Sequence, residues 1–229
     1  MAKCPGCNAI ITTMTHDQKE QTPMFILSGG LSSRFGTDKA LAHPDHQDQK
    51  SMIEIIASKT PFHDEPKIMV NRFRKYPNLN LEQIVDVYPQ KGPMGGIYTA
   101  LLLAESNHAL IVTCDMPMIT ELILKALVDS WQNHPTDVLC YTIKDRIHPF
   151  PGIYSNKIIP SLQLAIESDK LGLVDFILHQ TDSRFIEFNE KNCTSAFINV
   201  NTQNDLNTLN RTNENKKETT CRCQEQLKF

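Results

Sequence analysis

The sequence predicts an α/β fold built on a mostly parallel sheet, because strand-like and helix-like segments alternate along it. The strand-like runs are short and apolar, at 24–28, 67–71, 83–87, 109–113 and 137–142. The segments with helical spacing of apolar residues are 51–59, 95–105, 119–132, 156–166 and 171–179. A chain of 229 residues with 40% hydrophobic content suits one such domain with a substantial core.

The two ends of the chain differ in composition from its centre. Residues 1–21 are polar and irregular, and from about residue 207 the chain is rich in Asn, Thr, Lys, Glu and Gln. Such segments have few apolar side chains to bury. We therefore expect polar tails at 1–21 and 210–229 around a single domain at 22–209.

Charge and hydropathy limit the classes of partner that the protein could bind. A formal net charge of −3 gives no general attraction for nucleic acid or for an anionic membrane surface. The apolar runs are too short to span a bilayer, and 1–21 has no apolar core typical of a signal peptide. Seven cysteines, an odd number, are more typical of a reducing compartment than of a disulfide framework. We expect a cytoplasmic protein that binds neither nucleic acid nor membrane.

Four of the cysteines lie in the tails. Cys4 and Cys7 form a Cys-x-x-Cys pair, and Cys221 and Cys223 form a second pair with one residue between them. Four thiols could hold Zn²⁺, although zinc ribbons favour at least two residues between paired cysteines. The sequence leaves metal binding by these cysteines open.

The first strand-like run leads into a glycine-rich loop with two cations. Gly29 and Gly30 follow the run, and Arg34 and Lys39 come next. Glycine allows backbone N–H groups to approach phosphate oxygens closely, so the loop is a candidate polyphosphate cradle. It matches neither the Walker loop nor Gly-x-Gly-x-x-Gly, and an ordinary strand-to-helix turn is the alternative interpretation.

Polar residues follow the other strand-like runs. Asn71 follows Val70, Asp86 follows Val85, and Asp115 follows Cys114 at the ends of these runs. In open α/β sheets, ligands bind beyond the carboxyl ends of the strands. Asp115 offers a hard oxygen ligand of the kind that Mg²⁺ prefers, while the alternative role is an Asx turn or a helix cap.

A second glycine-rich turn, at 91–97, precedes the helix-like segment at 95–105. It contains Gly92, Pro93, Gly95 and Gly96. The start of a helix offers unpaired N–H donors to an anion or to the edge of a base.

These motifs, in this order and spacing, resemble those of the molybdenum cofactor guanylyltransferases. The segments that carry the resemblance are 27–30 with Arg34, Gly36 and Lys39, then 92–96, 114–117, 148–154 and 197–202 followed by Asp205 and Leu206. The resemblance covers about residues 23–209. It implies a glycosyltransferase-A-like nucleotidyltransferase fold, which is a Rossmann-like three-layer α/β/α sandwich.

The resemblance also implies roles for individual residues. It assigns nucleotide binding to Leu27, Ser28, Gly29, Gly30, Lys39, Asn71, Asp86, Gly92 and Asp115. It places Arg34, Lys39 and Asp115 in catalysis, with Asp115 as the Mg²⁺ ligand. It places His148, Asn199 and Asn201 on the acceptor side, where either asparagine could also reach the metal.

The implied reaction transfers GMP from GTP to the phosphate of molybdopterin or the molybdenum cofactor and releases pyrophosphate. A molybdoenzyme or a maturation protein would be a further partner. The chain departs from the family at Ser28, where Ala is usual, and at 43–50, where a polar stretch replaces a more compact turn. The alternatives are a cytidylyltransferase or sugar-phosphate nucleotidyltransferase of the same fold, and a non-catalytic nucleotide-binding adaptor.

Overall fold

The computed structural model describes residues 21–28, 38–44, 50–61, 64–70, 76–179, 182–188, 194–202, 204–206 and 208. Several predictions fall outside these ranges and stay predictions. They concern the two tails with Cys4, Cys7, Cys221 and Cys223, and the site residues Gly29, Gly30, Arg34 and Asn71.

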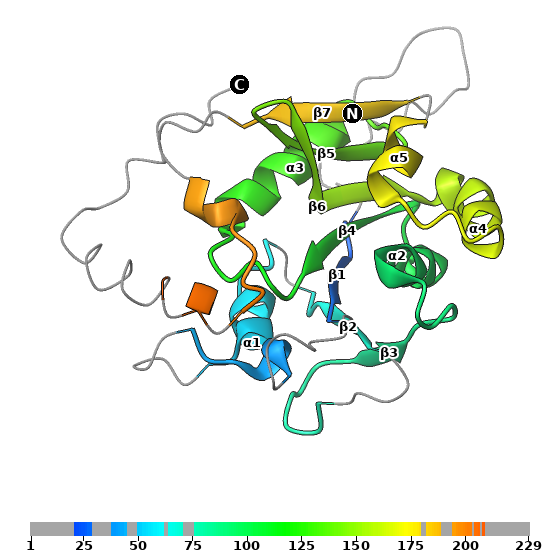
Figure 1. Ribbon diagram of the computed structural model, residues 1–229. Coiled ribbons are helices and arrows are strands. Elements are labelled where there is room, and N and C mark those ends of the chain that lie inside the picture. Colours follow the sequence, from blue (N-terminus) through cyan, green and yellow to red (C-terminus); the bar gives the residue numbers. More distant parts are fainter. Residues whose placement is uncertain are drawn as a thin grey trace, which may run out of the picture.

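The described residues form a seven-stranded sheet in the order β3-β2-β1-β4-β6-β5-β7 (Figure 1). Its strands are β1 (Met24–Leu27), β2 (Lys67–Val70), β3 (Gln83–Val85), β4 (His108–Thr113), β5 (Val138–Ile143), β6 (Arg146–Ser155) and β7 (Ser183–Glu187). Strand β6 runs antiparallel to β4 and β5, and the other pairings are parallel. The predicted α/β fold with a mostly parallel sheet is confirmed.

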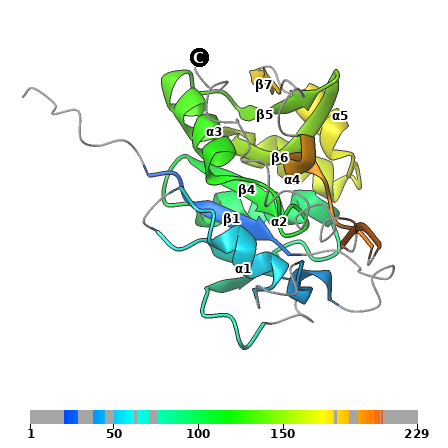
Figure 2. The same cartoon turned by 90° about the vertical axis from the view of Figure 1, so that its left-hand side faces the viewer.

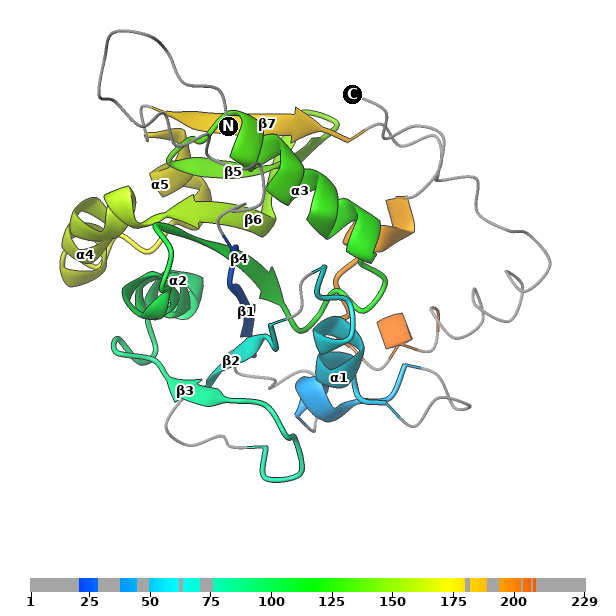
Figure 3. The same cartoon turned by 180° about the vertical axis from the view of Figure 1, so that it is seen from behind.

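Helices cover both faces of the sheet. They are α1 (Met52–Ala57), α2 (Gly92–Leu103), α3 (Glu121–Asn133), α4 (Ile159–Glu167) and α5 (Leu173–Leu178), with short 3₁₀ turns η1 (Lys39–Leu41), η2 (Asn156–Ile158) and η3 (Thr194–Phe197). Helices α1 and α3 lie on one face (Figure 2), and α2, α4 and α5 lie on the other (Figures 1 and 3). None of the helices in the described ranges has the length and apolar character needed to cross a membrane.

Each face of the sheet has its own apolar core. Strand side chains alternate between faces, so Ile26 packs with α1 and α3, whereas Phe25 and Leu27 pack with α2. Because both faces are covered, β1 is buried along its whole length and reads as a continuous apolar run. Cys114 and Cys140 are buried, and burial raises the pKa of each thiol to about 12.

Two strands were not predicted from the sequence, β6 and β7. Pro149 and Pro151 argue against a central strand at β6, since proline cannot donate to the ladder. In the structure the pairing register shifts between Cys140, opposite Gly152, and Tyr141, opposite His148. Both prolines therefore fall in a bulge between paired segments, where they break no ladder pairing with β5.

Candidate functional site

The carboxyl ends of the parallel strands β1, β2, β3 and β4 lie side by side and form one edge of the sheet. Three backbone hydrogen bonds, each of 3.1 Å, extend the pairing just beyond the strands: Cys114 donates to Leu27, Ser28 to Met69, and Asp86 to Val70. Residues that follow three different strands are thereby brought together, as the parallel topology requires.

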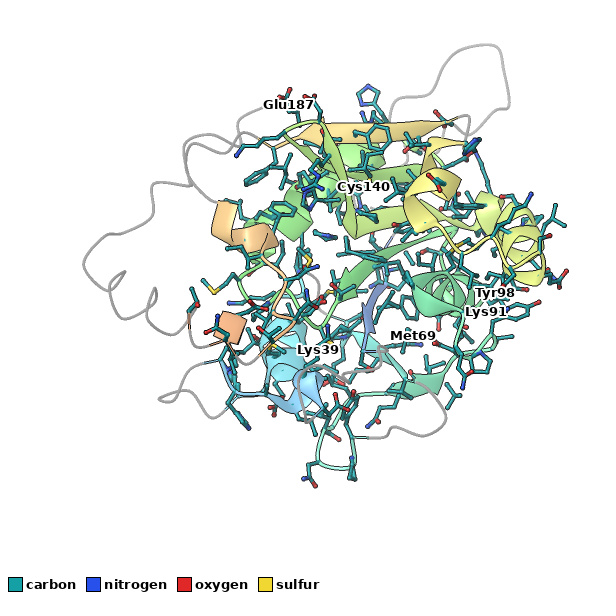
Figure 4. All side chains as sticks on the ribbon, in the orientation of Figure 1. Lys39, Met69, Lys91, Tyr98, Cys140 and Glu187 are labelled. Carbon is teal, nitrogen blue, oxygen red and sulfur yellow. The ribbon has the colours of Figure 1, made fainter. Side chains whose placement is uncertain are left out.

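An ion pair between Lys39 and Asp115 lies at this edge. The Lys39 ammonium donates to Asp115 Oδ2 at 2.9 Å, and the two side chains are only 17% and 14% exposed. The same ammonium donates to Asn201 Oδ1 at 3.3 Å. Figure 4 shows Lys39 on the α1 side of the sheet. The Lys39 ammonium of η1 therefore connects Asp115, which follows β4, with Asn201 in the C-terminal part of the domain.

Lys39 is held in place by the short turn that carries it. Asp38 caps η1, because its carboxylate accepts from the Ala40 N–H at 3.1 Å. The hydroxyl of buried Tyr76 donates to the other carboxylate oxygen of Asp38 at 3.3 Å. Desolvation by burial raises the pKa of Tyr76, which keeps its hydroxyl a donor.

The Asp115 carboxylate has a second oxygen that is buried and lacks a hydrogen-bond partner among the described residues. Together with Asn201 Oδ1 it presents hard oxygen donors, which fit Mg²⁺. The described ranges hold no cluster of three or more His, Cys, Asp and Glu side chains suited to a metal. A Mg²⁺ ion bound through Asp115 would take its other ligands from substrate phosphates and water, the usual arrangement for this ion.

Asp86 is a second carboxylate with a buried oxygen that lacks a described partner. Desolvation by burial raises its pKa from 3.8 to about 6. A Cβ built on Gly96 would lie 3.7 Å from Asp86 Oδ1 and 2.8 Å from Leu27 Cδ2. The missing side chain at Gly96 thus lets α2 pack closely on Leu27 at the end of β1, beside the carboxylate that follows β3.

Thr99 ties the chain after Asp86 to helix α2. Its hydroxyl accepts from the Val87 N–H at 2.9 Å and donates to the Gly95 carbonyl at 2.9 Å. Sequence reasoning missed this role, and the only sequence signal is a threonine within a glycine-rich and apolar helix. The helix itself begins at Gly92, three residues before the predicted start, and Lys91 makes no side-chain cap to its first N–H groups.

The residues predicted for the acceptor side come from two places, strand β6 and the segment that follows η3. His148 is half-buried on β6 and packs edge-on against Phe197 of η3, with ring centroids 5.7 Å apart. Burial, with a smaller contribution from Arg146, lowers the pKa of His148. Asn199 is exposed two residues after Phe197 and leads to Asn201 at the ion pair. Their roles toward an acceptor stay predictions.

A mostly parallel sheet with its polar site beyond the carboxyl ends of the strands defines an α/β protein of the class that binds its ligand at that end of the sheet. The chain matches the model of the MobA-like NTP transferase domain over residues 24–183. The chain therefore belongs to the MobA-like NTP transferase family, and it is a nucleotidyltransferase.

A sequence relative supports the family assignment, and two solved structures share the fold. A probable molybdenum cofactor guanylyltransferase of Flavobacterium johnsoniae is 35% identical over 83% of this chain and 97% of its own. The fold matches that of molybdopterin-guanine dinucleotide biosynthesis protein A from Archaeoglobus fulgidus, with a TM-score of 0.72 at 20% identity, covering 85% of this chain and all of that one. It also matches 2-C-methyl-D-erythritol 4-phosphate cytidylyltransferase from Thermus thermophilus, with a TM-score of 0.58 at 8% identity and coverage of 85% and 100%.

Proposed function

We propose that the protein transfers GMP from GTP to the terminal phosphate of molybdopterin or of its molybdenum-loaded form. An acceptor phosphate oxygen attacks the α-phosphorus of GTP, the new P–O–P bond forms, and the bond from the α-phosphorus to the bridging oxygen breaks. The electron pair of that bond leaves with pyrophosphate. The observation that carries the proposal is the Lys39–Asp115–Asn201 cluster at the sheet edge, in a chain whose relatives are named for this activity.

The acceptor supplies its own nucleophile, so the chain has to position the two phosphates and balance their charge. In this proposal Lys39 neutralises charge on the phosphates of GTP, and Asp115 holds the cation that the phosphates bring. A bound Mg²⁺ would act as a Lewis acid on the phosphoryl oxygens. Because Lys39 already pairs with Asp115, its ammonium must turn from the carboxylate toward the phosphates when substrate binds.

Asp86 is the proposed base-reading residue. Guanine presents an N1–H and an N2–H₂ group, and one carboxylate can accept from both. The buried oxygen of Asp86 needs such donors, since it has no partner among the described residues. The adjacent Gly96 keeps the approach free of a side chain.

The test is pyrophosphate release from GTP, CTP, ATP and UTP, each with Mg²⁺ and with or without molybdopterin. We expect release from GTP only when molybdopterin is present. Asp115→Asn should lower turnover about a hundredfold or more, by analogy with the loss of a transition-state charge contact. Glu187→Gln is the matched acid-to-amide control. Glu187 is the last residue of β7, the outermost strand on the opposite side of the sheet from β3.

Three other outcomes would redirect the proposal. Release from CTP would make the protein a cytidylyltransferase, an activity compatible with the same fold. Release from GTP with a sugar phosphate in place of molybdopterin would change the acceptor. Nucleotide binding without release from any of the four would indicate a non-catalytic adaptor.

A further inference from the structure

The segment that carries Asn201 is attached to the site at its backbone. The Val200 N–H donates to the Asp115 carbonyl at 2.8 Å, so the segment lies directly against the chain that follows β4. Val200 and Leu206 are buried and pack with Met52 of α1. The chain is therefore fixed on both sides of Asn201, although Asn201 itself is exposed.

Asp205 fixes the backbone at Asn201 itself. One of its carboxylate oxygens accepts from the Asn201 N–H at 3.0 Å and from the Thr202 N–H at 2.8 Å. In the opposite direction, the Asp205 N–H donates to the Thr202 hydroxyl oxygen at 3.1 Å. This reciprocal arrangement is a capping box, which here closes the turn between Asn201 and the helical residues 204–206.

The turn determines where the Asn201 side chain starts. An exposed asparagine has several rotamers available, and only a fixed backbone keeps its amide oxygen within reach of the Lys39 ammonium, 3.3 Å away. The backbone donors at Asn201 and Thr202 lower the pKa of Asp205, so the carboxylate is ionised at neutral pH and accepts both N–H groups strongly.

We propose that Asp205 is a positioning residue that holds the Asn201 amide oxygen against the Lys39–Asp115 ion pair. Asp205 touches neither Lys39 nor Asp115 in the contacts described, and it acts through Asn201. Its kinetic consequences rest on the function proposed above, whereas its effect on Asn201 does not.

The direct test observes the Asn201 side chain by NMR. Its amide resonance is identified as the one lost in Asn201→Ala, and Lys39→Met should shift it, because Lys39 donates to its oxygen. In Asp205→Ala the resonance should move, and Lys39→Met should no longer affect it. Asp205→Asn keeps an acceptor oxygen and should restore most of the coupling. A resonance that still responds to Lys39→Met in Asp205→Ala overturns the proposal.

The kinetic test is a double-mutant cycle. Asp205→Ala should lower turnover roughly tenfold, since a small misplacement near the reacting groups is costly. In the Asn201→Ala background, Asp205→Ala should have almost no further effect, because the residue through which it acts is already gone. Independent, multiplicative effects of the two substitutions would contradict the proposed role.

Thr120→Ala is the matched control, since Thr120 caps α3 by accepting from the Ile123 N–H at 3.3 Å. It also removes a helix cap, but it should leave the Asn201 resonance unchanged. Thermal unfolding of each variant shows whether it is folded. If the wild-type protein releases no pyrophosphate, the proposed function fails, and the NMR test still decides the role of Asp205.

Discussion

Lys39 lies 2.9 Å from Asp115 Oδ2 and 3.3 Å from Asn201 Oδ1, on the same two side chains that would serve a bound Mg²⁺. An ammonium group is a compact positive charge that can take the place of a metal ion beside oxygen ligands. In the free protein, a divalent cation bound to Asp115 as proposed would therefore compete with Lys39 for the same carboxylate.

This competition predicts that replacing Lys39 has opposite effects on metal binding and on turnover. Lys39→Met should strengthen Mn²⁺ binding in the absence of nucleotide, as measured by EPR titration. It should weaken transition-state stabilisation by about 2–4 kcal/mol, measured as a loss of turnover with GTP. Lys67→Met is the matched control, since Lys67 pairs with Glu82 at 3.2 Å at the start of β2. Unchanged Mn²⁺ affinity in Lys39→Met would contradict the competition.

The proposed role of Asp86 predicts that nucleotide binding depends on pH. Its raised pKa of about 6 means that the free protein carries a protonated Asp86 at pH 5 and an ionised one at pH 7. Guanine donors favour the ionised form, so GTP affinity should rise as pH increases through about 6 and then level off. Calorimetry at several pH values would measure this, and Asp86→Asn should remove the dependence.

The same shift affects stability with the opposite sign. A carboxyl whose pKa is higher in the folded than in the unfolded chain stabilises the fold below pH 3.8, and this contribution is lost as pH rises to about 6. Urea unfolding without nucleotide should show a smaller loss over this range in Asp86→Asn than in the wild type. Equal losses would mean that Asp86 is not buried in the free protein.

At the scale of elements, the start of α2 is set by glycines that cannot be enlarged. A Cβ on Gly95 would collide with the backbone carbonyl oxygen of Tyr88, which cannot move without shifting the chain after Asp86. Gly95→Ala should therefore lower the free energy of unfolding by about 1–3 kcal/mol and weaken GTP binding. Gly172→Ala is the control, because the nearest atom there, Asp175 Oδ2, is the end of a side chain that can rotate. Urea unfolding and GTP titration check both.

The elements also show how far sequence reasoning reaches. All five predicted strands and all five predicted helices are present within a few residues, because buried parallel strands read as short apolar runs and helices as longer segments with apolar residues at helical spacing. The hairpin between β5 and β6 left no such signal. Its turn residues Lys144 and Asp145 both have positive φ, where glycine or asparagine is usual, and the prolines of β6 suggest a loop.

The site was predictable in the same uneven way. Asp86 and Asp115 could be found because they follow apolar runs, and parallel strands bring such positions together. Lys39 could be found because it is a cation close behind the glycine-rich loop. The contact between Lys39 and Asn201 joins residues 162 positions apart, and no local pattern encodes it. Thr99 and Asp205 act through backbone groups, so their roles became visible only with the hydrogen bonds of the structure.

At the scale of the whole molecule, the two ends of β4 differ: its carboxyl end leads into the proposed site, and its first residue is buried in the core. Asp115 follows its carboxyl end, and His108 begins the strand, which is six residues or about 20 Å long. His108 is fully buried and stacks on Trp131, with ring centroids 3.8 Å apart. Its ring nitrogens lie 2.7 Å from the Thr22 hydroxyl and 3.0 Å from the Asn107 amide oxygen.

This separation predicts that damage at the far end of β4 leaves the site intact. His108→Ala removes the stacked ring and leaves two polar partners without their contact, so it should lower the free energy of unfolding by about 2–4 kcal/mol. GTP affinity, measured at a temperature where the variant is fully folded, should stay within about twofold of the wild-type value, because additivity holds between distant sites. A large loss of GTP affinity in the folded variant would show that the two ends of β4 are coupled through the sheet.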